Sequence, residues 1–82
     1  MTVSNETDPV AAGVLAFVAG LVNGEFGPDD DLFATGGLSS LKSLELVVHV
    51  EREYGVAVTG DDLSLDNFRT AAAISRLVRR LQ

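Results

Sequence analysis

Three serine hydroxyls stand close together near the middle of the chain, at Ser39, Ser40 and Ser43, shortly after a pair of glycines. The segment that follows them is apolar at helical spacing and ends at Tyr54 and Gly55, so it predicts a helix from about Ser40 to Tyr54. Ser39 precedes this helix, where a serine oxygen can accept a hydrogen bond from an exposed first-turn amide. Ser43 lies on the core side, and we expect its hydroxyl to bond to a carbonyl one turn back.

Ser40 therefore has the hydroxyl best placed for chemistry. It lies on the first turn, next to glycines that leave it accessible, at the positive end of the helix dipole. Such a position suits the binding or covalent attachment of a phosphate group. A hydrolase would also need a base near this serine, but the lone histidine, His49, is nine residues away, about 13 Å further along the same helix.

Length and composition restrict the class of protein. With 82 residues and no cysteine, the chain predicts one small domain without disulfides and without room for a deep catalytic cleft. The acidic run Asp29–Asp31 is typical of a turn with solvated carboxylates, and it lacks the further ligands that a metal site needs. We therefore expect no catalytic residues and no metal.

Charge is distributed unevenly along the chain. All twelve acidic residues lie at or before Asp66, whereas four of the six basic residues are arginines that follow it. An acidic body of this kind repels nucleic acid and attracts basic protein surfaces. The most apolar run, Val10–Val22, has thirteen residues, and a membrane span needs roughly 20. We expect a cytoplasmic monomer that binds neither nucleic acid nor membranes.

The beginning of the chain predicts a helix followed by a long loop. Asp8 and Pro9 form a start signal, and Asn23 and Gly24 form a stop signal. The loop that follows is rich in turn-forming residues and contains two apolar anchors for the core, Leu32 and Phe33.

Beyond Gly55 the pattern predicts a short helix and a longer one. Thr59 with Asp62 resembles a capping box, and Val58 and Leu63 lie where a hydrophobic staple would close a short helix near residues 61–66. Thr70 can cap a last helix, whose arginines at 76, 79 and 80 lie away from its apolar face and are explained by solubility and the helix dipole. The prediction is an all-α bundle of three main helices and one short helix, with 1–7 as a disordered tail and 8–82 as a single domain.

The helix after Ser39 has more apolar surface than one core-facing stripe requires. Its core side consists of Leu46, Val47, Val50 and Tyr54. A second group, which we call the apolar stripe, lies roughly opposite and consists of Leu41, Leu44 and Val48. This stripe is either a surface for a protein partner or packs beneath the loop of residues 24–38. The neighbouring acids Glu45, Glu51 and Glu53 either attract a basic partner or form an ordinary solvated face.

Two segments carry a resemblance to acyl and peptidyl carrier proteins. DLFATGGLSSLKSLELVVHVEREYGV (31–56) resembles their attachment segment, and DDLSLDNFRTAAAISRLV (61–78) is similar to their third helix, linking loop and last helix. In that family one serine after a glycine-rich loop receives 4′-phosphopantetheine from coenzyme A, and the thiol of this arm carries acyl or aminoacyl groups as thioesters. The implied partners are a phosphopantetheinyl transferase, a loading enzyme, and downstream synthase or tailoring enzymes.

The resemblance assigns the attachment to Ser40, with Ser39 as the second choice. Leu41, Leu46 and Val47 fall at the family's spacing from Ser40. Acyl carriers usually have Asp immediately before the modified serine, whereas this chain has Ser39. The Gly-Gly-x-Ser pattern of peptidyl carriers would instead select Ser39.

The resemblance thus implies a carrier protein, not an enzyme, in polyketide or nonribosomal-peptide secondary metabolism. Its expected partner surface consists of Leu41, Leu44, Glu45, Val48 and Glu51. We expect a freestanding protein because the chain runs from Met1 to Gln82 without a partner domain, although a domain excised from a synthase would look the same. The alternative is a helical interaction adaptor without a prosthetic group.

Overall fold

The computed structural model describes residues 8–34 and 37–82, and all regular structure in these two ranges is helical. The elements are α1 (Pro9–Val22), α2 (Ser40–Tyr54), the 3₁₀ helix η2 (Gly60–Asp62), α3 (Leu65–Phe68) and α4 (Ala71–Leu81). This architecture confirms the predicted all-α bundle with three main helices. The tail expected for residues 1–7 lies outside the described residues.

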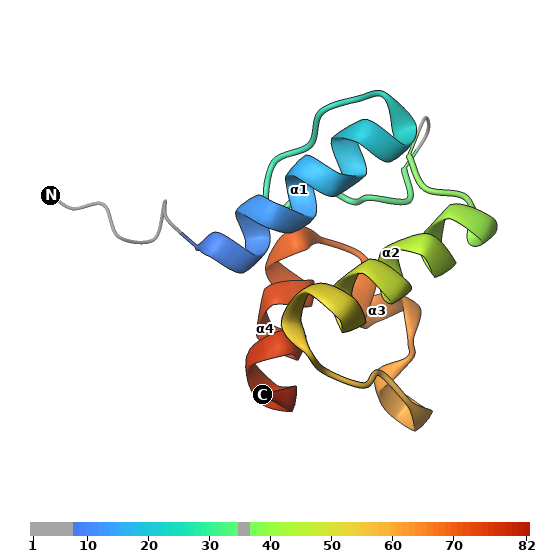
Figure 1. Ribbon diagram of the computed structural model, residues 1–82. Helices are drawn as coiled ribbons and strands as arrows, with labels where there is room; N and C mark the ends of the chain where they lie inside the picture. Colours follow the sequence, from blue (N-terminus) through green and yellow to red (C-terminus); the bar gives the residue numbers. More distant parts are fainter. Residues whose placement is uncertain (1–7, 35–36) are drawn as a thin grey trace, which may run out of the picture.

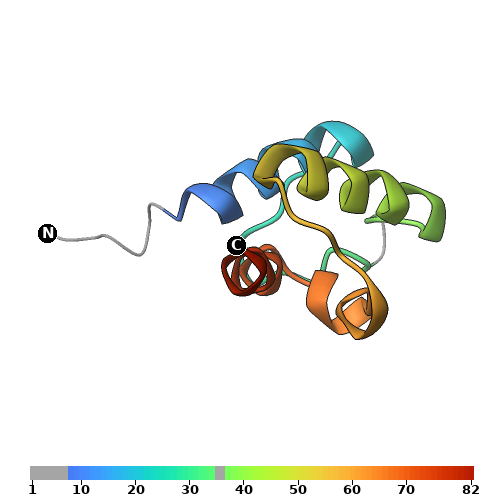
Figure 2. The same ribbon diagram turned by 60° about the horizontal axis from the view of Figure 1, so that its bottom comes forward.

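The helices form two layers, seen most clearly in Figure 2. The pair α1 and α2 makes one layer, and α4 with α3 makes the other (Figures 1 and 2). Helix α1 packs on α4 and on α2, and α3 packs on α4. Every main helix contributes fully buried side chains to the core, as does the long connection between α1 and α2: Val14, Val18, Leu32, Leu46, Val50, Ile74, Leu77 and Val78.

The three main helices begin at the predicted caps. Asp8, Ser39 and Thr70 have extended backbones, and each side chain accepts a hydrogen bond from a first-turn amide. Helices α1 and α2 end at residues in the left-handed conformation, Asn23 with φ 58° and Gly55 with φ 66°. Local side-chain chemistry therefore sets the ends of these helices.

The short helix differs from its prediction. In place of one helix near residues 61–66, the chain forms η2 and then α3, and Thr59 makes no side-chain cap hydrogen bond. Leu63, the expected partner in a hydrophobic staple, is 53% exposed. The predicted capping box and staple are therefore wrong.

Asp62 explains this difference, because it bonds to residues further along the chain. Its carboxylate pairs with Arg80 of α4 at 2.7 Å. Its carbonyl accepts a hydrogen bond from Asn67 Nδ2 at 2.9 Å. Asp62 thus links the segment between α2 and α3 to both α4 and α3. Its carboxylate is therefore engaged with Arg80 and does not reach back to Thr59.

A second polar cluster joins the start of α1 to α4. Asp8 Oδ2 accepts a 2.7 Å hydrogen bond from the hydroxyl of Ser75, which is 1% exposed. Asp8 Oδ1 lies 3.0 Å from Arg79 Nη2. Arg79 and Arg80 therefore have specific partners, beyond the solubility and helix-dipole roles that the sequence predicts.

Candidate functional site

The three clustered serines have different hydrogen-bonding roles. Ser39 Oγ accepts from the Lys42 amide at 3.2 Å, as a helix cap does. Ser43 Oγ donates to the Ser40 carbonyl at 2.6 Å, which confirms the expected bond one turn back. The Ser40 hydroxyl has no hydrogen-bond partner within residues 8–34 and 37–82, and its side chain is exposed. Of the three hydroxyls, only that of Ser40 is not engaged in building the helix.

The start of α2 provides a favourable environment for an anion on Ser40. The helix is fifteen residues long, so its dipole places partial positive charge at Ser40 and Leu41. The amides of these two residues find no acceptor in the described part of the chain. A phosphodiester on Ser40 Oγ therefore fits the exposure and the electrostatics of this position.

The side chain of Lys42 connects the first turn of α2 to helix α1. Its Nζ donates a 2.9 Å hydrogen bond to the carbonyl of Leu21, in the last turn of α1. That carbonyl has no partner within its own helix, and a lysine is a common way to satisfy it. Lys42 therefore links the first turn of α2 to the last turn of α1.

The connection before Ser39 is anchored tightly. Leu32 and Leu38 are buried, and the Leu38 amide donates to the Leu32 carbonyl at 2.7 Å. A Cβ on Gly37 would clash with the Leu32 carbonyl, so glycine is required for this close approach. Of the two predicted anchors, Leu32 is fully buried and Phe33 is half-buried. The chain thus enters α2 from a fixed direction.

The apolar stripe lies on the surface. Leu41 is 71% exposed, Leu44 57% and Val48 46%, so these residues do not pack beneath the preceding loop. Leu46 and Val50, from the other side of α2, are fully buried. The structure therefore removes the packing alternative and leaves an uncovered apolar surface on α2 that begins one residue after Ser40.

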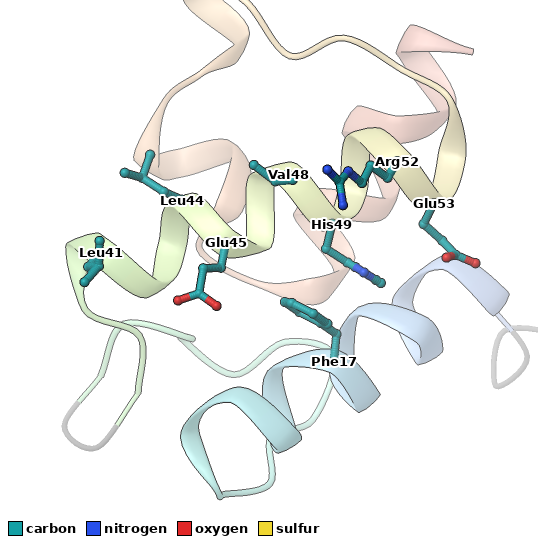
Figure 3. Close-up of a pocket in the computed structure, with 8 residues that line it drawn as sticks. All are labelled: Phe17, Leu41, Leu44, Glu45, Val48, His49, Arg52 and Glu53. Carbon is teal, nitrogen blue, oxygen red and sulfur yellow. The ribbon is translucent and has the colours of Figure 1, made fainter.

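The apolar stripe borders a shallow groove between α1 and α2, shown in Figure 3, with a volume of about 570 Å³. Its floor includes Phe17 of α1, whose ring stacks on that of His49 with centroids 4.0 Å apart and planes 7° apart. Glu45 and Glu53 lie on either side of His49 along α2 (Figure 3). Sequence reasoning did not include Phe17 in this surface, because its helical spacing fits the core side of α1 equally well.

Glu51 differs from the other acids of α2. Its carboxylate accepts a 2.8 Å hydrogen bond from the Val58 amide, and the residue is half-buried. Glu51 does not line the groove, whereas Glu53 does. This hydrogen bond holds the segment after Gly55 against α2, and the contact of Glu51 with a partner stays a prediction.

Other kinds of site find no support in the described residues. No three His, Asp or Glu side chains in residues 8–34 and 37–82 come together in a way that could hold a metal ion. No helix in the same ranges has the length and hydropathy needed to span a bilayer.

Comparison with known protein families identifies a match that covers most of the chain. A family model described as the phosphopantetheine attachment site matches residues 12–78, which include all three clustered serines. The match extends from the first half of α1 into the last turns of α4. Neither the curated proteins nor the solved structures that were searched yielded a significant match.

Proposed function

The chain belongs to the phosphopantetheine-attachment family, whose members carry 4′-phosphopantetheine covalently, and from this premise we propose that Ser40 is the residue that bears the group. The observation that carries the proposal is the difference in hydrogen bonding among the three serine hydroxyls. Ser39 caps α2 and Ser43 bonds to the helix backbone, whereas the exposed Ser40 hydroxyl has no partner among the described residues.

Attachment would form a bond between Ser40 Oγ and the phosphorus atom that bears the pantetheine arm in coenzyme A. The phosphoanhydride bond of coenzyme A breaks, its nucleotide leaves, and the hydroxyl proton passes to a base of the transferase. Once attached, the arm supplies a thiol that holds an acyl or aminoacyl group as a thioester. Ser40 contributes an accessible hydroxyl, and the first turn of α2 stabilises the phosphodiester charge.

Intact mass measurement tests the assignment. The chain is incubated with coenzyme A, Mg²⁺ and a broad-specificity phosphopantetheinyl transferase, and we expect a mass gain of one phosphopantetheine. Ser40→Ala should abolish the gain. Ser39→Ala is the matched control, which should weaken the helix cap by about 1 kcal/mol and still be modified. Modification of Ser40→Ala together with loss in Ser39→Ala would move the site to Ser39, and an unmodified wild type would favour an adaptor without a prosthetic group.

We further propose that the apolar stripe and Glu45 form the surface on which partner enzymes dock. Leu41, Leu44 and Val48 are exposed beside Ser40, and carboxylates at the groove suit basic enzyme surfaces. The expected partners are the transferase, a loading enzyme and the synthase or tailoring enzymes that use the loaded arm. We expect these contacts to be weak and to release quickly, which suits a carrier that visits several enzymes.

We place this carrier domain, residues 8–82, in polyketide or nonribosomal-peptide secondary metabolism. Support for this placement comes from the sequence, which combines features of peptidyl carriers with features of acyl carriers. The Gly-Gly loop is similar to that of peptidyl carriers, whereas the E-L-V and N-F-R-T segments are similar to those of acyl carriers. Loading assays of the modified chain with adenylating enzymes and with acyltransferases test this placement. Loading only by enzymes of fatty acid synthesis would contradict it.

A further inference from the structure

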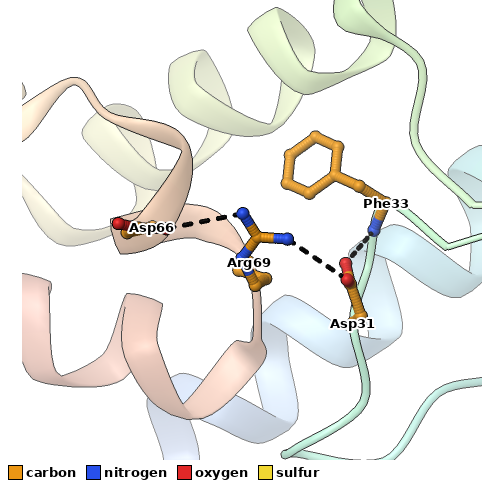
Figure 4. A network of polar contacts seen from close by, with 4 residues as sticks. All are labelled: Asp31, Phe33, Asp66 and Arg69. Atoms are coloured by element: carbon orange, nitrogen blue, oxygen red, sulfur yellow. Dashed lines mark hydrogen bonds and ion pairs between the residues drawn. The ribbon is translucent and has the colours of Figure 1, made fainter.

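The side chain of Arg69 links helix α3 to the chain segment that precedes α2. Its Nη1 lies 3.3 Å from Asp31 Oδ2, and its Nη2 lies 3.4 Å from Asp66 Oδ1 (Figure 4). The other oxygen of Asp31 accepts a 2.8 Å hydrogen bond from the Phe33 amide. The guanidinium thus holds a carboxylate that itself shapes the turn at residues 31–33.

Backbone hydrogen bonds continue this contact toward Ser40. The Arg69 carbonyl accepts from the Leu32 amide at 2.7 Å, and the Leu32 carbonyl accepts from the Leu38 amide at 2.7 Å. Leu38 directly precedes Ser39, the cap of α2. Two successive hydrogen bonds therefore connect Arg69 to the turn that presents Ser40.

The ion pair is suited to positioning the chain more than to holding the whole fold together. The side chains of Arg69 and Asp31 are both 43% exposed, so their attraction is strongly screened and adds little to overall stability. The ion pair matters more for the local conformation, because Arg69 offsets the negative charge of three consecutive carboxylates, those of Asp29, Asp30 and Asp31. Without the cation, repulsion among these carboxylates would favour conformations in which Asp31 leaves the Phe33 amide.

We infer that Arg69 is a positioning residue for the modification of Ser40. Acting through Asp31 and Leu32, it holds the entry to α2 in the conformation that the transferase binds. This inference rests on the proposed attachment at Ser40. If the entry adopts several conformations, only a fraction of the free protein is competent to bind, and the apparent affinity falls by that fraction.

The test is the steady-state kinetics of modification by a broad-specificity phosphopantetheinyl transferase with coenzyme A. We expect Arg69→Gln to raise KM for the carrier by about threefold to tenfold with little change in kcat, because the bound conformation is unaltered. Arg69→Lys keeps the charge but loses the fork that reaches two carboxylates, so it should restore KM in part. Arg80→Gln is the matched control, since it breaks an ion pair of α4 that lies outside this network, and it should leave KM unchanged.

Amide hydrogen exchange of the free protein separates positioning from direct contact with the transferase. In Arg69→Gln the amides of Leu32 and Leu38 should exchange faster, while those of α4 should not. Asp31→Ala removes both the ion pair and the oxygen that accepts from the Phe33 amide, and its effect on KM should not add to that of Arg69→Gln in the double variant. Asp31→Ala also serves as the test if Arg69→Gln does not fold.

The outcomes distinguish the inference from the proposed function. A wild type that gains no phosphopantetheine at Ser40 contradicts the proposed function. A wild type modified at Ser40, with Arg69→Gln showing the parent KM or unchanged exchange at Leu32 and Leu38, overturns the positioning role. Equal increases in KM for Arg69→Gln and Arg80→Gln would also overturn it, because they would indicate a general effect of charge.

Discussion

Replacing Asp8 by alanine should destabilise the bundle more than loss of an ordinary helix cap. Asp8 Oδ1 accepts from the amides of Val10 and Ala11 at 3.1 and 3.2 Å. Oδ2 accepts from Ser75, whose hydroxyl lies in the core between α1 and α4. One side chain therefore satisfies the first turn of α1 and a buried group of α4.

The magnitude follows from these two roles. Loss of the cap costs about 1 kcal/mol, and a buried hydroxyl left without an acceptor costs about 1 to 3 kcal/mol. We expect Asp8→Ala to lower the free energy of unfolding by about 2 to 4 kcal/mol, which for a domain of this size corresponds to a fall in Tm of about 10 °C or more. Arg79 adds little to this sum, because its side chain is largely exposed.

Asp8→Asn is the matched variant for the effect of charge. Asparagine caps as well as aspartate and can still hydrogen-bond with Ser75, so we expect a cost of at most about 1 kcal/mol. Burial acts to raise the pKa of Asp8, but the hydrogen bonds from Ser75, Ala11 and Val10 and the charge of Arg79 together hold it below the ordinary value. The stabilisation from ionised Asp8 is therefore present above about pH 4 and is lost as pH falls through the lower pKa of the folded state.

Urea denaturation followed by far-UV circular dichroism measures both effects. The difference in unfolding free energy between wild type and Asp8→Asn should shrink as pH falls below 4, whereas Asp8→Ala should remain destabilised by its lost hydrogen bonds. If Asp8→Ala at neutral pH lies within about 0.5 kcal/mol of wild type, the assignment of Asp8 as a shared cap and acceptor is wrong.

Two further predictions concern the region around Ser40. Val48→Gln should leave Tm nearly unchanged, because the side chain is 46% exposed. It should slow loading of the modified carrier by a partner enzyme. A large fall in Tm, or loading at the parent rate, would contradict a docking role for Val48. Gly37→Ala should lower the free energy of unfolding by about 1 to 3 kcal/mol through the clash with the Leu32 carbonyl. It should also slow the modification of Ser40. A variant that melts and is modified like the parent would show that the segment before α2 can accommodate the extra methyl group at no cost.

The helix ends and the stripe could be predicted from the sequence because they depend on near neighbours. Asp8, Ser39 and Thr70 accept from amides two or three residues away. The exposure of Leu41, opposite the buried Leu46, follows from the number of residues per turn. Local chemistry was sufficient for these features, and it also singled out the Ser40 hydroxyl.

The parts that were missed depend on residues distant in the sequence. Arg69 and Asp31 are 38 residues apart, and Ser75 and Asp8 are 67 apart. Nothing in a local pattern indicates which of several acids will meet a given arginine. The same limit explains the short helix, where the pairing of Asp62 with Arg80 displaced a locally plausible capping box.

The uncovered stripe on α2 has a consequence for how the protein behaves in concentrated solution. Leucine side chains that are more than half exposed attract one another, and a monomer keeps such a surface only if copies repel each other at longer range. The net charge of −6 supplies this repulsion near neutral pH. It vanishes near the isoelectric point of about 4.4, where the same leucines would promote self-association. The acidic composition is therefore expected to oppose self-association through this exposed surface near neutral pH.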